Sequence, residues 1–94
     1  MIAIFSKKKL YKIGQIDQIV RNYFVDHPSV TEVCAKDLMH KFIGKGIFFK
    51  NYSNGLPIRQ LLNQLDEGNQ LDLFKQVRVI RNEINGNWHF KKQD

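Results

Sequence analysis

The fold is constrained most by residues 55–90, GLPIRQLLNQLDEGNQLDLFKQVRVIRNEINGNWHF, in which a helical pattern leads directly into a β-hairpin pattern. Pro57 suits the first turn of a helix, where its missing N–H costs nothing. Apolar residues then recur at the spacing that lines one helical face, at Ile58, Leu61, Leu62 and Leu65. The hairpin signal is Asn85-Gly86, between the strand-like segments 77–82 and 88–92. A helix followed by two antiparallel strands is therefore predicted.

Two registers of this hairpin are open. A two-residue turn would pair Glu83 with Trp88, whereas a loop of three residues would pair Ile84 with Trp88 instead. In the second register Ile80 and Phe90 lie on the same face as Trp88. We expect this second register, because a hairpin normally packs its apolar face on the core.

A first helix is predicted at about residues 13–25. Its apolar side chains recur with helical spacing at Ile13, Ile16, Ile19, Val20, Tyr23 and Phe24. The opposite side would carry polar residues, namely Asp17, Gln18, Arg21 and Asn22. Pro28 ends the helix, because its ring cannot continue the helical hydrogen-bond ladder.

A second helix is predicted after a short connection. Residues 30–33 favour an extended segment, although Ser29 or Thr31 could equally cap a longer helix. The apolar face of the second helix comprises Ala35, Leu38, Met39, Phe42 and Ile43. Gly44 follows and suits a left-handed helix stop.

Residues 44–54, GKGIFFKNYSN, are predicted to form a long loop, because glycine, serine and asparagine favour turns. Four of its side chains are too apolar to be left in water, and we expect at least two of them to pack over the core: Ile47, Phe48, Phe49 and Tyr52. Rings left exposed beside Lys45 and Lys50 would instead offer faces for stacking single-stranded bases.

The length of 94 residues predicts one domain over residues 1–94. The net charge of +6 is concentrated at the two ends of the chain. Residues 1–12 carry four lysines and no acid, residues 13–74 are nearly neutral, and residues 75–94 hold five basic and two acidic groups. Residues 6–12, SKKKLYK, lack periodicity and are predicted to be a mobile basic arm. If both ends share one side of the fold, they would attract a polyanion; otherwise they only aid solubility.

The single Cys34 has no partner for an internal disulfide, which suits a reducing compartment, and the cytoplasm is expected. Residues 1–5, MIAIF, are too short for a signal-peptide core, and the lysines follow them rather than precede them. No run approaches the roughly 20 apolar residues that a membrane span needs. Secretion and membrane insertion are therefore not expected.

Catalytic motifs are not apparent in the sequence. His27, His40 and His89 are widely separated and match neither HExxH nor a Cys/His metal spacing. The GKG sequence at residues 44–46 lacks the spacing of a phosphate-binding loop. We therefore expect no catalytic residue, no metal and no cofactor, and the protein is not expected to be an enzyme.

The predicted order of helix, short extended segment, helix, helix, strand, turn and strand over residues 13–92 resembles the winged helix-turn-helix superfamily. Residues 56–71, LPIRQLLNQLDEGNQL, resemble the passage from recognition helix to wing, in which spaced leucines precede a turn with glycine and a further apolar residue. The resemblance implies an α+β fold, a small winged helix-turn-helix of three helices followed by a C-terminal β-hairpin wing. It also implies binding of double-stranded DNA, with the third helix in the major groove and the wing along the backbone.

The leading hypothesis is thus a small DNA-binding protein, a transcriptional regulator. Base edges would be contacted by the outward face of the third helix, at Arg59, Gln60, Asn63 and Gln64. Phosphate contacts would come from the wing and the arm, at Arg78 or Arg81 with His89, Lys91, Lys92, Lys7, Lys8 and Lys9. Acidic residues at the far end of the third helix weaken it as a DNA contact, so we expect the hairpin to supply more of the affinity.

An alternative hypothesis is a protein–protein interaction module without DNA binding, because a fold alone does not decide function. Its contact surface would be the aromatic loop, at Phe48, Phe49 and Tyr52. A homodimer is compatible with either hypothesis, since one wing and one helix give a small footprint.

Overall fold

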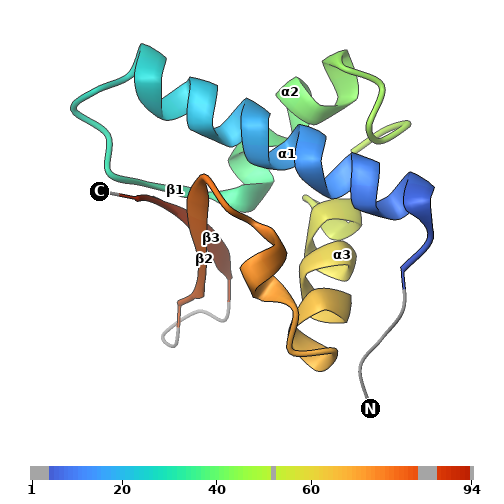
Figure 1. The fold of residues 1–94 in the computed structure, drawn as a ribbon. Coiled ribbons are helices and arrows are strands. Elements are labelled where there is room, and N and C mark those ends of the chain that lie inside the picture. Colours follow the sequence, from blue (N-terminus) through green and yellow to red (C-terminus); the bar gives the residue numbers. More distant parts are fainter. Residues whose placement is uncertain (1–4, 52, 83–86, 94) are drawn as a thin grey trace.

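The computed structural model describes residues 5–51, 53–82 and 87–93 and has an α+β fold (Figure 1). Within this part of the chain, three α-helices pack with a three-stranded antiparallel sheet. The elements are α1 (Lys7–Asp26), β1 (Glu32–Cys34), the 3-10 helix η1 (Ala35–Leu38), α2 (Met39–Gly44), α3 (Leu56–Glu67), the 3-10 helix η2 (Leu71–Leu73), β2 (Val77–Arg81) and β3 (Trp88–Lys92). The predicted order of three helices and a C-terminal hairpin is confirmed, and it is compatible with a small winged-helix fold.

The first helix begins earlier than the sequence pattern predicts. Ser6 caps α1, and its hydroxyl accepts a hydrogen bond of 3.2 Å from the backbone N–H of Lys9. A serine cap satisfies one of the free N–H groups of a first turn, and lysine is a good helix former. The prediction of a mobile arm is therefore wrong for residues 7–12, which form the first turns of α1.

The sheet has the strand order β1-β3-β2. Trp88 lies opposite Arg81, and Phe90 lies opposite both Val79 and Val33. Both registers considered for the hairpin are therefore wrong, and Ile80 lies on the face opposite to Trp88. Consecutive strand residues alternate between faces, and the observed pairing buries Val77 and Val79 together with Trp88 and Phe90. The predicted turn residues, Glu83 to Gly86, lie outside the described residues.

The short extended segment predicted before the second helix is confirmed in part. The strand β1 begins at Glu32 rather than at Val30, and it pairs with β3 as the third strand of the sheet. The second helix is split into η1 and α2. It ends at Lys45 as its C-cap, and the left-handed residue is Gly46, at φ 75°, rather than the predicted Gly44.

The core lies between the three helices and the inner face of the sheet (Figure 1). Its aromatic centre is Phe90, whose ring centroid lies 5.6 Å from that of Phe74 and 6.5 Å from that of Phe42. Fully buried aliphatic residues from α1 and α3 surround this centre, namely Ile16, Val20, Ile58, Leu62 and Leu65. The core thus holds α3 and the hairpin in a fixed relation to α1.

One acidic side chain is part of this packing. Asp17 was predicted on the outward side of the first helix, but it is only 5% exposed. Its carboxylate oxygens accept hydrogen bonds from the backbone N–H groups of Lys75, at 3.1 Å, and Gln76, at 3.0 and 3.2 Å. The segment that leads into β2 is therefore fixed to α1.

The loop after α2 divides its apolar residues between core and solvent. Ile47 is buried, and Phe48 packs on the core with its ring at a centroid distance of 6.1 Å from that of Phe42. Phe49 is 95% exposed. The expectation that at least two of these residues pack is confirmed. Tyr52 lies outside the described residues.

Candidate nucleic-acid interface

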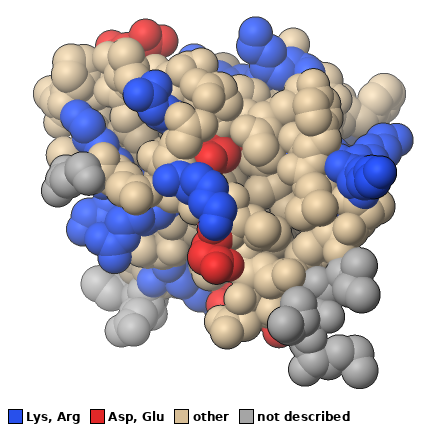
Figure 2. Space-filling model, viewed as in Figure 1, with Lys and Arg blue, Asp and Glu red and all other residues tan. Residues whose placement is uncertain are grey.

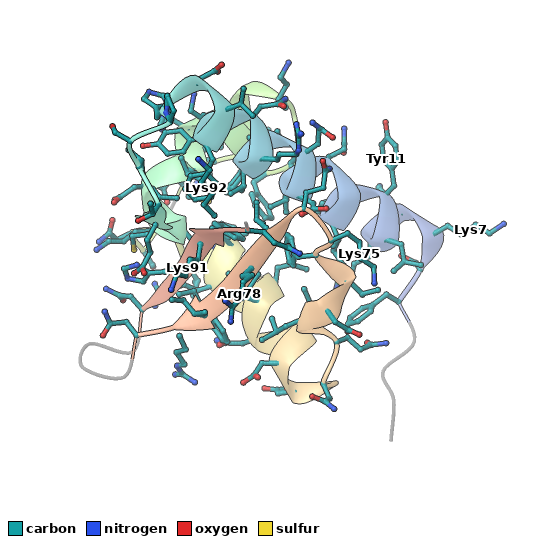
Figure 3. All side chains as sticks on the ribbon, turned by 60° about the vertical axis from the view of Figure 1, so that its left-hand side comes forward. Lys7, Tyr11, Lys75, Arg78, Lys91 and Lys92 are labelled. Carbon is teal, nitrogen blue, oxygen red and sulfur yellow. The ribbon has the colours of Figure 1, made fainter. Side chains whose placement is uncertain are left out.

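The outer face of the sheet carries a pair of basic side chains. Arg78 on β2 lies directly opposite Lys91 on β3, and both are exposed. Because Phe90 and Val79 point into the core, their neighbours Lys91 and Arg78 point away from it (Figure 3). Among the described residues, neither cation is within ion-pair distance of a carboxylate. We call Arg78 and Lys91 the sheet pair.

The nearest acid across the sheet has another partner. Glu32 on β1 is paired in register with Lys91, but its carboxylate Oε2 lies 3.0 Å from Nδ1 of His89. His89 is half-buried on the same outer face. The predicted role of His89 in DNA contact stays a prediction, and the structure places its Nδ1 beside Glu32.

Further basic residues surround the hairpin. Lys75 precedes β2 and is exposed, whereas Lys92 lies opposite Val77 and is half-buried. Lys92 lies toward α1, where it lines a pocket with Arg21, and in Figure 3 Lys75 lies between Arg78 and Lys7, with Lys7 at the start of α1. The guanidinium group of Arg81 lies over the ring of Trp88, 5.5 Å from its centroid. The sequence left Arg78 and Arg81 as alternatives for phosphate contact. Arg81 packs on Trp88, and Arg78 belongs to the sheet pair.

The basic side chains of the two chain ends lie apart in the structure. The space-filling view shows Lys and Arg gathered over the side that carries the hairpin, with other cations at the opposite side near the start of α1 (Figure 2). The predicted arm residues Lys7, Lys8 and Lys9 belong to the first turn of α1. The two charged ends of the chain therefore do not meet in a single patch.

The outward face of α3 is largely occupied by contacts within the protein. Arg59 is half-buried and donates a hydrogen bond of 2.6 Å to the backbone carbonyl of Ser53. Gln64 accepts a hydrogen bond from the ammonium group of Lys9. Gln60 is exposed and forms no side-chain hydrogen bond with any other described residue. Of the predicted base contacts, Gln60 is the one that stays available without a rearrangement.

The fourth predicted base contact, Asn63, instead joins α3 to the hairpin. Its Oδ1 accepts a hydrogen bond of 2.9 Å from the indole Nε1 of Trp88, a residue only 3% exposed. A buried indole N–H needs such a partner. Asn63 therefore holds the hairpin against α3.

Asn63→Ala should lower the free energy of unfolding by about 1–2 kcal/mol, because the indole N–H of Trp88 loses its acceptor. Urea denaturation would measure this loss. The matched control is Gln60→Ala on the same helix, for which a change within about 0.5 kcal/mol is expected. Equal stabilities of the two variants would contradict the structural role of Asn63.

A groove separates the start of α1 from α3. It is lined by polar and basic side chains around one aromatic ring, at Lys9, Lys12, Gln60, Gln64 and Phe48, with Pro57 and Leu61. The ammonium group of Lys12 lies over the ring of Phe48, 5.4 Å from its centroid. The structure thus brings predicted arm and helix residues together, away from the sheet pair.

Two basic residues near this surface, Lys75 and Arg21, were not identified as candidate contacts from the sequence. The position of Lys75 depends on the bonds between its segment and Asp17, which join residues 58 positions apart. Arg21 on α1 lines a pocket with Lys92. The sequence predicted a basic surface in this region only through the excess of basic over acidic groups in residues 75–94.

Groups of three or more His, Cys, Asp or Glu side chains able to hold a metal ion do not occur among the described residues. A search of the same residues found no helix both long enough and apolar enough to cross a membrane. Comparisons with protein-family models, with curated proteins and with solved structures gave no match.

Proposed function

We propose that the protein binds double-stranded DNA, mainly through backbone phosphates, and acts as a small transcriptional regulator in the cytoplasm. The observation that carries this proposal is the sheet pair, two exposed cations side by side on the outer face of the hairpin. Arginine and lysine are the usual partners of phosphate oxygens, and such contacts supply most sequence-independent affinity. Lys75, just before β2, and Lys92, at the end of β3, add charge near the sheet pair (Figure 3).

The state of α3 supports contacts to the backbone over contacts to bases. Arg59, Asn63 and Gln64 are engaged within the protein. The far end of the helix exposes Asp66 and Glu67, which repel phosphate. A helix with few available donors and an acidic end gives little direct readout, so weak sequence preference is expected.

A titration of a labelled DNA duplex followed by fluorescence anisotropy tests this proposal. The logarithm of the binding constant should fall linearly with the logarithm of salt concentration, with a slope of about −2.7 to −3.6 if three or four phosphates are neutralised. Binding that is absent at about 50 mM salt would contradict the proposal. So would a binding constant that does not change with salt.

A second candidate function is protein binding through the loop after α2. The observation that favours it is Phe49, which is 95% exposed while its neighbour Phe48 packs on the core. Exposed aromatic side chains are typical anchors of protein interfaces. Of the other residues predicted for this surface, Phe48 is largely used in packing, and Tyr52 lies outside the described residues.

Phe49→Ser should leave the free energy of unfolding within about 0.5 kcal/mol of the wild type, because the ring has almost no contacts to lose. If the loop binds a protein, the same change should abolish a stoichiometric complex seen by affinity capture and light scattering. The control is Phe48→Ser, which should destabilise the domain itself. A complex that survives Phe49→Ser would exclude this surface.

A further inference from the structure

A pocket of about 190 Å³ borders the basic residues around the hairpin and shares Lys92 with them; it lies between the second half of α1, the residue before β2 and the end of β3. Its lining combines basic, apolar and amide side chains, at Arg21, Lys92, Phe24, Val25, Pro28, Gln76 and Gln93. The helix α1, the loop that follows it, the residue before β2 and the strand β3 thus each contribute to one concave site.

The charge of this pocket is unbalanced. Arg21 and Lys92 both line it, and no acidic residue among the described part of the chain does so. Two acids of α1 lie near these residues in sequence. Asp17, one turn before Arg21, accepts the backbone N–H groups of Lys75 and Gln76. Asp26, which follows Val25, lines a different pocket with Lys41 and Lys45. Two cations at one concave site repel each other, and a bound anion would remove this repulsion.

The remaining lining restricts the kind of anion. Phe24 is buried and forms an apolar floor, while Val25 is 60% exposed beside it. The amide of Gln76 is held in place, because its Nε2 donates a hydrogen bond of 2.9 Å to Oε1 of Gln18. A site with two cations at an apolar wall suits a ligand that has a charged head and a compact apolar body.

We propose that this pocket binds a small organic anion, a carboxylate or phosphate group carried on an apolar body. Arg21 and Lys92 contact the anionic group, and Phe24, Val25 and Pro28 contact the body. The volume is below the roughly 300 Å³ of a drug-sized site, so the ligand is small. Ligand binding at this site does not require DNA binding.

The test is an NMR titration of the full chain with phenyl phosphate, inorganic phosphate and benzyl alcohol. Phenyl phosphate should shift the amide signals of Arg21, Val25, Gln76 and Gln93 in a saturable way. Inorganic phosphate and benzyl alcohol should each bind about tenfold more weakly, because each lacks one half of the recognised structure. The double variant Arg21→Gln/Lys92→Gln should lose about tenfold or more in affinity for phenyl phosphate.

Matched variants separate a built site from general attraction of anions. Lys7→Gln/Lys8→Gln removes the same charge at the other end of α1 and should leave the affinity unchanged. Val25→Ser should weaken phenyl phosphate about threefold and leave inorganic phosphate unaffected, because only the apolar contact is lost. Equal losses in the two double variants would overturn the proposal, as would shifts spread over all basic residues. A DNA duplex that displaces phenyl phosphate through Arg21 and Lys92 would assign the pocket to the nucleic-acid backbone and overturn a small-molecule site.

Discussion

Replacing Gly55 with alanine should lower the free energy of unfolding by about 3 kcal/mol or more. Gly55 adopts a φ of 90° immediately before α3, a conformation that alanine rarely adopts and that costs about 1–3 kcal/mol. An added Cβ atom would also lie 2.5 Å from Cβ and 3.1 Å from Cα of Lys36. The contact is with rigid atoms of η1, so the backbone itself would have to move.

Urea denaturation measures this loss, and Gly14→Ala is the matched control. Gly14 lies within α1, and a Cβ atom added there would meet nothing within 4 Å. Alanine in a helix is favoured over glycine by about 0.5–1 kcal/mol, so this variant should be slightly more stable than the wild type. A loss below about 1 kcal/mol for Gly55→Ala would contradict the close approach of α3 and η1.

Asp17→Ala should destabilise the protein by about 2–3 kcal/mol. The carboxylate accepts the backbone N–H groups of Lys75 and Gln76, and alanine would leave both without this partner. Asp17→Asn keeps one acceptor oxygen and should recover about half of the loss. The hairpin would be affected first, because these bonds fix the segment that enters β2.

Asp66→Ala is the control for Asp17→Ala, because Asp66 is an exposed aspartate on α3. Its replacement should change the free energy of unfolding by no more than about 0.5 kcal/mol. Thermal unfolding would show the same order of stabilities as urea denaturation. Equal effects of the two changes would show that the bonds of Asp17 to the hairpin segment contribute nothing measurable.

The helices could be predicted from the sequence because apolar residues at helical spacing lie on the one face of the helix that is buried. Ile58, Leu61, Leu62 and Leu65 have the predicted spacing and are all buried in α3. The start of α1 was missed, because it depends on the cap at Ser6 rather than on periodicity. A capping hydrogen bond does not change the spacing of apolar residues, so this spacing alone does not show where a helix begins.

Contacts between distant segments could not be predicted from spacing alone. Asp17 lies beside the apolar stripe of α1, and only the hairpin segment packed against it makes its burial favourable. The register that places Trp88 opposite Arg81 likewise depends on the packing of β3 against the core and on its pairing with β1. Asn63 was assigned to bases because the position of Trp88 near α3 was not known.

The position of the basic residues was predicted in part. The charge count identified residues 75–94 as the richer end, and Arg78 and Lys91 lie exposed there as a pair. It did not show that the first lysines of α1 lie at the other side of the molecule (Figure 3). That separation allows each group of charges to be removed without the other.

The most direct measurement of the central claim is the salt dependence of duplex DNA binding in two charge-matched double variants. Arg78→Gln/Lys91→Gln removes the sheet pair, and Lys7→Gln/Lys8→Gln removes two exposed cations at the start of α1. The sheet-pair variant should bind at least about tenfold more weakly, with a salt slope reduced by about 1.8, or about 0.9 for each lost phosphate contact. The α1 variant should keep nearly the wild-type slope. Equal slopes in both variants, or a larger loss in the α1 variant, would contradict DNA binding through the outer face of the hairpin.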